Sequence, residues 1–296
     1  MIPQKKITDF RKQILTWYRK NQRDLPWRKT RDPYRILISE VMSQQTQISR
    51  VIPKYEAWLD KFPTVQSLAA SNISDVLRYW SGLGYNRRAL NLKKTAEMII
   101  EKYKGKFPTN EKELLSLPGI GQYTSRAVLC FAFDQQVAVV DTNVRKVILT
   151  QFKNELGIMN YELGENNKIN NSLLSIQDAL KTNKITDKDI EVIAQLLLPK
   201  GKAYEWNQAM MDYAAAMLKK EKIPIPKQTK FHGSRRYYRG QILKILLKKK
   251  NISIGDVGPL IKKEFTSSEK EWLLNLLEEL QKEGFISIKN SNLELA

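Results

Sequence analysis

The stretch LLSLPGIGQYTSRAV, residues 114–128, joins two apolar helical segments through a Pro-Gly-x-Gly turn. Gly119 and Gly121 allow the backbone to bend sharply and to come close to a ligand. The N–H groups that open the next helix then point outward, where the helix dipole favours a phosphate group. From the turn alone, a tight helix connection and a phosphate-binding loop are equally good interpretations.

Helical periodicity continues on both sides of this turn. Apolar residues recur at mixed three- and four-residue spacing across residues 33–60, as in helices buried on one face. The same pattern predicts helices at about 65–80, 86–104, 110–116, 122–133, 142–152, 170–181, 187–198 and 205–220. Thr109 is expected to cap the helix at 110–116. Strand signals are nearly absent from this part of the chain, so we expect an all-α core.

The C-terminal residues follow a different pattern. Two prolines and several lysines indicate a linker at 222–234. Beyond the linker, helices are predicted at 240–250, 255–264 and 268–283, and a β-hairpin at 285–288 and 293–295. Three helices followed by a small hairpin resemble a winged-helix module, which we place at 235–296.

The composition favours a polyanionic partner. Fifty Lys and Arg residues against 31 Asp and Glu give a formal net charge of +19. Such an excess indicates nucleic acid before an anionic membrane surface, although it could also serve only to keep the protein in solution. The chain has one cysteine, Cys130, and one histidine, His232. These numbers exclude an internal disulfide and a Cys/His zinc site. Cys130 lies in an apolar run and is expected to be buried.

The sequence gives no signal for a membrane or for export. The first residues, MIPQKKITDF, have no apolar signal core, and no stretch approaches the roughly 18 apolar residues of a membrane span. We therefore expect a soluble cytoplasmic protein, nucleoid-associated in a prokaryote-like cell, with no targeting segment and no membrane partner.

Several long segments together resemble one known family. They are LPWR (25–28), DPYRILISEVMSQQTQ (32–47), FPTVQSLA (62–69), YWSGLGYNRRALNL (79–92), the turn above, VVDTNVRKV (139–147) and EWNQAMMDYAAAM (205–217). In this order, they make residues 10–217 similar to the catalytic core of the MutY-type adenine DNA glycosylases, in the helix-hairpin-helix superfamily. The resemblance implies two helical lobes, 1–29 with 134–221 and 30–133, with double-stranded DNA bound across the cleft.

The resemblance implies that the turn, as the family's hairpin, binds the DNA backbone without reading sequence. The positions expected to contact the backbone are Leu117, Gly119, Gly121, Gln122 and Thr124.

Removing a base requires a better leaving group and a stabilised sugar cation, two tasks that suit two carboxylates. Glu40 lies in an apolar helix, where burial could raise its pKa and keep it protonated; its match to the family acid implies protonation of a purine. Asp141 precedes a helix and has the form of an N-cap, but within VVDTNV the resemblance implies that it stabilises the cation. Asn143 matches a polar partner of the acid and the attacking water.

Tyr123 lies where the related endonuclease III enzymes carry a lysine that attacks the sugar. A tyrosine cannot form a Schiff base, so the sequence predicts a monofunctional glycosylase that leaves an abasic site. Lys112 and Lys146 could be suspected of a lyase role, but we expect both to be surface charges.

An enzyme that acts on a base within a duplex must extrude that base and fill the gap. The resemblance implies that Gln44 and Gln45 project beside the extruded base and that Tyr85 forms a wedge next to the opposite base. The positions that match the adenine pocket are Trp27, Arg28 and Gln208.

The chain departs from the family in two places. Most members hold a [4Fe–4S] cluster with four cysteines after the last core helix. This chain has one cysteine and cannot hold such a cluster, so we expect no cofactor. The C-terminal module also replaces the family's 8-oxoguanine recognition domain. It could add DNA contacts through Arg235, Arg236 and Arg239, or it could substitute structurally for the missing cluster.

Three functions remain open from the sequence. The first is removal of adenine opposite G or 8-oxoguanine by a monomer. Glu40 favours this function, because protonation of a purine requires an acid. The second is removal of thymine or uracil from mismatches with G. The third is a non-catalytic winged-helix DNA-binding protein, which would need neither Glu40 nor Asp141.

Overall fold

The computed structural model describes residues 2–152, 185–219 and 230–296. The predicted helix at 170–181 and most of the predicted linker at 222–234 lie outside these residues. Among the helices that are described, none is both long enough and apolar enough to cross a membrane.

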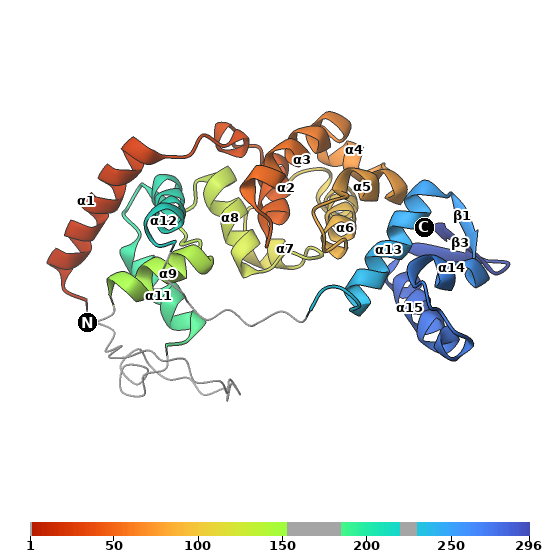
Figure 1. Ribbon diagram of the computed structural model, residues 1–296. Helices are drawn as coiled ribbons and strands as arrows, with labels where there is room; N and C mark the ends of the chain where they lie inside the picture. The colour runs from red at the N-terminus through yellow and green to blue at the C-terminus, as the bar shows by residue number, and fades with distance from the viewer. Residues whose placement is uncertain (1, 153–184, 220–229) are drawn as a thin grey trace. The chain divides into compact units, whose positions relative to one another are not determined.

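The described part of the chain before the C-terminal module is helical, which confirms the predicted fold class (Figure 1). Its elements are α1 (Gln4–Asn21), η1 (Pro26–Lys29), α2 (Pro33–Ser43), α3 (Ile48–Lys61), α4 (Val65–Ala69), α5 (Ile73–Trp80), α6 (Arg87–Tyr103), α7 (Glu111–Leu115), α8 (Gln122–Phe133), α9 (Thr142–Gln151), α11 (Asp187–Leu197) and α12 (Ala203–Met217).

Local capping explains where the helix boundaries differ from the predicted ones. The run predicted as one helix at 65–80 is two, because the side chain of Asn72 accepts a hydrogen bond from the Asp75 N–H and starts α5 there. Asn110, and not Thr109, caps α7: its Oδ1 accepts from the Glu113 N–H at 2.9 Å. The choice of cap depends on backbone geometry, which the sequence pattern does not give.

The contacts divide the chain into two compact units. Unit 1 comprises Met1–Leu37, Thr109–Ser116 and Ile120–Ile225, and unit 2 comprises Ile38–Pro108, Leu117–Gly119 and Pro226–Ala296. This division differs from the lobes predicted above, since α7 and α8 group with unit 1 and the C-terminal module groups with unit 2. A grouping by contacts does not test the predicted domain bounds, which stay a prediction.

Each unit has an aromatic core. In unit 1 the ring of Phe10 on α1 meets Phe152 and Trp206 edge to face, with centroids 5.0 and 5.8 Å apart. In unit 2, Trp58 on α3 meets Trp80 on α5 in the same way, with centroids 5.7 Å apart. These tryptophans and phenylalanines are buried, so they fix the helices against each other around large apolar surfaces.

The C-terminal module consists of α13 (Arg235–Lys248), β1 (Asn251–Ser253), α14 (Ile254–Ile261), η2 (Ser267–Glu269), α15 (Lys270–Glu283), β2 (Ile286–Lys289) and β3 (Asn292–Leu295). The three strands form an antiparallel sheet in the order β1-β3-β2. The predicted hairpin is confirmed, and its two turn residues, Asn290 and Ser291, have positive φ. The first helix begins at Arg235 rather than 240, because Ser234 caps it.

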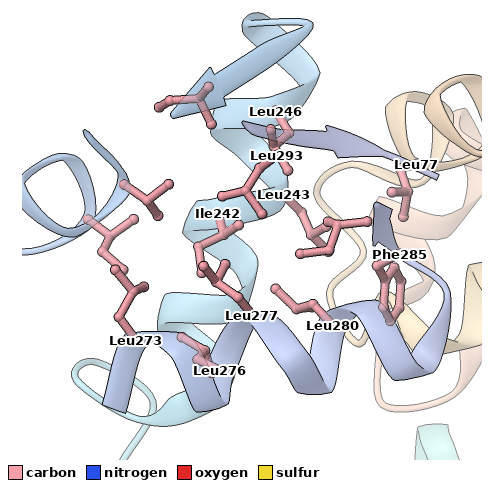
Figure 2. Packing of buried hydrophobic residues seen from close by; sticks show 14 of the residues in the cluster. Leu77, Ile242, Leu243, Leu246, Leu273, Leu276, Leu277, Leu280, Phe285 and Leu293 are labelled. Carbon is pink, nitrogen blue, oxygen red and sulfur yellow. The ribbon is translucent and has the colours of Figure 1, made fainter. Parts of the chain in front are cut away.

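The core of the module continues into the helices that precede it within unit 2. Leucines of α15 face leucines and isoleucines of α13, and Leu77 of α5 lies near Phe285 (Figure 2). Ile73 of α5 and Leu90 of α6 belong to the same buried cluster. The module therefore shares a hydrophobic core with α5 and α6.

Candidate active site

Asp141 is the N-cap of α9, as predicted. Its Oδ1 accepts a hydrogen bond from the Val144 N–H at 2.7 Å, and its Oδ2 accepts one from Nδ2 of Asn143 at 2.8 Å. The side chain is partly exposed. The structure thus brings Asp141 and Asn143 together, with the carboxylate oriented by one backbone and one side-chain donor.

The surroundings of Asp141 act on its charge in opposite directions. Burial raises the pKa of Asp141, and the hydrogen bonds from Val144 and Asn143 partly offset this effect. A carboxylate that is only partly solvated interacts more strongly with a positive charge that develops beside it than a carboxylate in bulk water does. The arrangement suits the stabilisation of a cation.

The extended segment that leads to Asp141 is held by side-chain amides. Oδ1 of Asn207 accepts from the Val139 N–H at 2.8 Å, and its Nδ2 donates to the Val137 carbonyl at 3.0 Å. Oε1 of Gln195 accepts from the Ala138 N–H at 2.9 Å. Asn207 is buried on α12 and was missed from the sequence, although an amide within an apolar helix is a usable signal.

In unit 1, α8 begins immediately after the predicted phosphate-binding turn. Its N-cap, Gly121, is exposed and no side chain caps it. Thr124 is buried, and Nε2 of Gln122 donates to Glu191 at 2.8 Å. A phosphate at this end would therefore meet backbone N–H groups first. Tyr123 lies in the same first turn and is partly exposed.

In unit 2, the tip of the turn packs against α6. Leu117 is buried, and the carbonyl of Pro118 accepts from the Thr95 hydroxyl at 2.8 Å. Gly119 has φ 75°, and a Cβ built there would lie 2.5 Å from Nδ2 and 2.8 Å from Cβ of Asn91. The position requires glycine for two reasons, backbone conformation and space.

Two of the predicted pocket residues are engaged inside unit 1. Nη1 and Nη2 of Arg28 donate to the two oxygens of Asp212 at 2.7 and 2.8 Å. Burial acts to raise the pKa of Asp212, but the hydrogen bonds and the charge of Arg28 hold this pKa below its ordinary value. Oε1 of Gln208 accepts from the Tyr18 hydroxyl at 3.0 Å. Trp27 is partly exposed. Asp212, the partner of Arg28, was missed from the sequence.

The remaining predicted site residues lie in unit 2. Glu40 on α2 is partly exposed although Val41 beside it is buried, and its protonation stays a prediction. Gln44 is partly exposed and Gln45 is exposed in the loop after α2. Tyr85, before α6, is 42% exposed. Exposure is what side chains need if they are to enter a DNA duplex.

Comparison with known proteins identifies the family of this chain. Residues 38–154 match the model of the HhH-GPD superfamily base excision DNA repair proteins. A solved structure of a thermostable thymine-DNA glycosylase is 32% identical, with a TM-score of 0.60, and the match covers 74% of this chain and 90% of that one. The chain belongs to the HhH-GPD superfamily.

Curated relatives in this superfamily include two adenine DNA glycosylases. The protein from Mycolicibacterium smegmatis is 48% identical over 137 residues, which are 46% of this chain and 47% of the relative. The protein from Buchnera aphidicola subsp. Baizongia pistaciae is 36% identical over 195 residues, 64% of this chain and 53% of the relative. The chain thus spans about half the length of the curated relatives that it matches.

The iron–sulfur cluster that many HhH-GPD proteins carry does not fit this chain. Cys130 is its one cysteine, and a four-thiolate cluster needs four. The thiol is buried on α8, as predicted, and its Sγ accepts a hydrogen bond from Nδ2 of Asn207 at 3.3 Å. Its surroundings are those of a packing residue.

Of the two lysines suspected of a lyase role in this HhH-GPD chain, Lys146 donates to the carbonyl of Leu218 at 3.2 Å and Lys112 is exposed. The amine of Lys146 thus has a structural partner at the end of α12.

Proposed function

We propose that this protein is a monofunctional DNA glycosylase that hydrolyses the N-glycosidic bond of adenine mispaired with G or 8-oxoguanine. The observation that carries the proposal is the carboxylate of Asp141, which is oriented by the Val144 N–H and by the side chain of Asn143. A helix cap requires only the hydrogen bond from the Val144 N–H, and not the second one from Asn143.

In the proposed reaction, Glu40 donates a proton to the leaving purine as the bond to the sugar breaks. The carboxylate of Asp141 stabilises the resulting oxocarbenium ion, and water adds to the sugar carbon and gives up a proton, which returns Glu40 to its protonated form. Asn143 orients Asp141 and the attacking water. The products are free adenine and an abasic site.

The proposed partner is double-stranded DNA that contains a mismatch or lesion, bound by a monomer without a cofactor in the cytoplasm, at the nucleoid. The formal net charge of +19 and the first turn of α8, which has no side-chain cap, support contact with the DNA backbone.

DNA binding is expected to weaken steeply as the salt concentration rises, because lysines and arginines that neutralise phosphates release counterions. Fluorescence anisotropy with a mismatched duplex at 50 to 200 mM salt would measure this, with a loss of roughly 10³-fold or more if six or more phosphates are neutralised. A flat response would rule out an electrostatic DNA complex.

Incubation with substrate DNA and borohydride should trap little or no covalent adduct, because Tyr123 cannot form a Schiff base with the sugar. Gel electrophoresis of the reduced mixture would measure the adduct. As a control for the suspected amine, Lys146→Arg should change nothing; efficient trapping that this substitution removes would assign Lys146 a lyase role.

A second candidate is the removal of thymine or uracil opposite G. The observation that favours it is the 32% identity to a thymine-DNA glycosylase over 90% of that chain. An excision assay with A:G, A:8-oxoguanine, T:G and U:G duplexes separates the two candidates. Adenine release from the first two supports the proposal, and release only from the last two contradicts it.

For the C-terminal module we propose a structural role. Its candidate DNA-binding arginines include Arg235, which pairs with Glu279 at 2.7 Å, and Arg239, which pairs with Glu283 at 2.7 Å. Its core also includes residues of α5 and α6. Both observations favour packing over direct contact with DNA.

A further inference from the structure

Two side chains proposed to enter the DNA stack stand on unusual backbone. Gln45 has φ 53° and Tyr85 has φ 47°, both in the left-handed region. This conformation costs an L-residue about 1–3 kcal/mol and persists only where the surrounding structure enforces it. Something in unit 2 must therefore hold both loops in place.

The loop before Gln45 is held by Arg88, which lies in the first turn of α6. Nη1 of Arg88 donates to the carbonyl of Val41 at 2.6 Å and to the carbonyl of Gln44 at 2.7 Å. The Gln44 carbonyl belongs to the peptide group that joins Gln44 to Gln45. The guanidinium thus fixes the peptide plane directly before the left-handed residue.

The loop before Tyr85 is held by the other nitrogen of the same guanidinium. Nη2 of Arg88 donates to the carbonyls of Leu83 and Gly84 at 3.1 and 3.2 Å. The indole N–H of Trp80 donates to the same Gly84 carbonyl at 2.9 Å. The peptide group that joins Gly84 to Tyr85 is therefore fixed in the same way.

The position requires the shape of an arginine. The guanidinium offers five N–H donors in one plane, so it can serve two loops at once, whereas a lysine ammonium is a single point. Its carbon Cζ lies 5.1 Å from the ring centroid of Trp80 and 5.6 Å from that of Tyr85. Burial lowers the pKa of Arg88 to about 10, so the group keeps its charge at neutral pH.

We infer that Arg88 is a positioning residue that ties the Gln45 and Tyr85 loops to one guanidinium and so sets the spacing of the two side chains that enter the duplex. The role in base extrusion rests on the proposed function. The tie between the loops does not depend on the proposed function, because it is a property of the DNA-free protein.

The first test needs no DNA. In Arg88→Lys, hydrogen exchange of the amides should rise in at least one of the two loops, residues 41–46 and 83–86, because a single ammonium cannot replace a donor that both loops share. The matched control is Arg87→Lys, the same change at the neighbouring exposed arginine, whose ion pair with Glu283 is 3.9 Å long. Unchanged exchange in both loops of Arg88→Lys would overturn the inference.

The second test measures extrusion directly. A duplex with an A:G mismatch carries 2-aminopurine next to the adenine, and its fluorescence rises when the adenine leaves the stack. With Asp141→Asn added to prevent turnover, Arg88→Lys should lower the extruded fraction while Arg87→Lys leaves it unchanged. In the active protein, Arg88→Lys should slow single-turnover excision about 10- to 100-fold.

A double-mutant cycle separates positioning from general damage to the fold. The background for this cycle is a protein in which Gln45 and Tyr85 are both changed to alanine. If Arg88 acts through these two side chains, adding Arg88→Lys to that background should lower extrusion less than about two-fold. Losses that multiply would overturn the inference. Absence of excision by the unaltered protein would count against the proposed function, whereas the exchange experiment decides the tie between the loops independently.

Discussion

Asp141→Asn should abolish base excision and leave binding to a mismatched duplex largely intact. Asparagine is as good an N-cap as aspartate, so the hydrogen bond from the Val144 N–H and the start of α9 are kept. Only the negative charge is lost, and with it the stabilisation of the sugar cation. We expect single-turnover excision to fall on the order of 10³-fold or more.

A matched control would separate the loss of charge from the loss of a cap. Asn72 caps α5 with the same geometry, accepting from the Asp75 N–H at 2.7 Å, and has no part in the proposed chemistry. Asn72→Ala should lower the free energy of unfolding by about 1 kcal/mol and keep excision. Substantial turnover by Asp141→Asn would remove Asp141 from its proposed role.

Gly119→Ala should damage both stability and DNA binding. The positive φ of 75° costs an alanine about 1–2 kcal/mol. The new methyl would also lie 2.8 Å from Cβ of Asn91, which a rotation of the Asn91 side chain cannot move away. The expected loss in the free energy of unfolding is about 2 kcal/mol or more, measured by urea denaturation.

The second glycine of the turn provides the control. Gly121 has an ordinary φ of −96°, and a Cβ there would meet no atom within 4 Å. Gly121→Ala should therefore change the stability by less than about 1 kcal/mol. Equal destabilisation by the two substitutions would contradict the packing of the tip against α6.

The same two glycines show what a motif in the sequence can and cannot predict. The Pro-Gly-x-Gly pattern predicts a turn with an exposed helix start, and α8 does begin at Gln122. The pattern gives the glycines the same role, yet only Gly119 is required by its φ and by a neighbour. That neighbour, Asn91, is 28 positions earlier in the chain, and no local pattern connects the two.

A local signal also predicted the cap at Asp141, because a cap depends on a few consecutive residues, whereas the partnership with Asn143 was implied by the family resemblance. Asn207 and Asp212 could not be assigned roles in this way. Their partners, the segment before Asp141 and the guanidinium of Arg28, lie more than 60 positions away. A polar residue in an apolar helix indicates that a partner exists but not which one it is.

The sequence by itself thus determined the helical fold class, the superfamily core and the carboxylate that begins α9. Helix periodicity and capping act over a few residues, so the sequence encodes them directly. Only the tertiary structure decided that α5, α6 and the C-terminal module share one core, and that Arg88 serves two loops. Such contacts depend on which surfaces meet after the chain folds, which periodicity cannot specify.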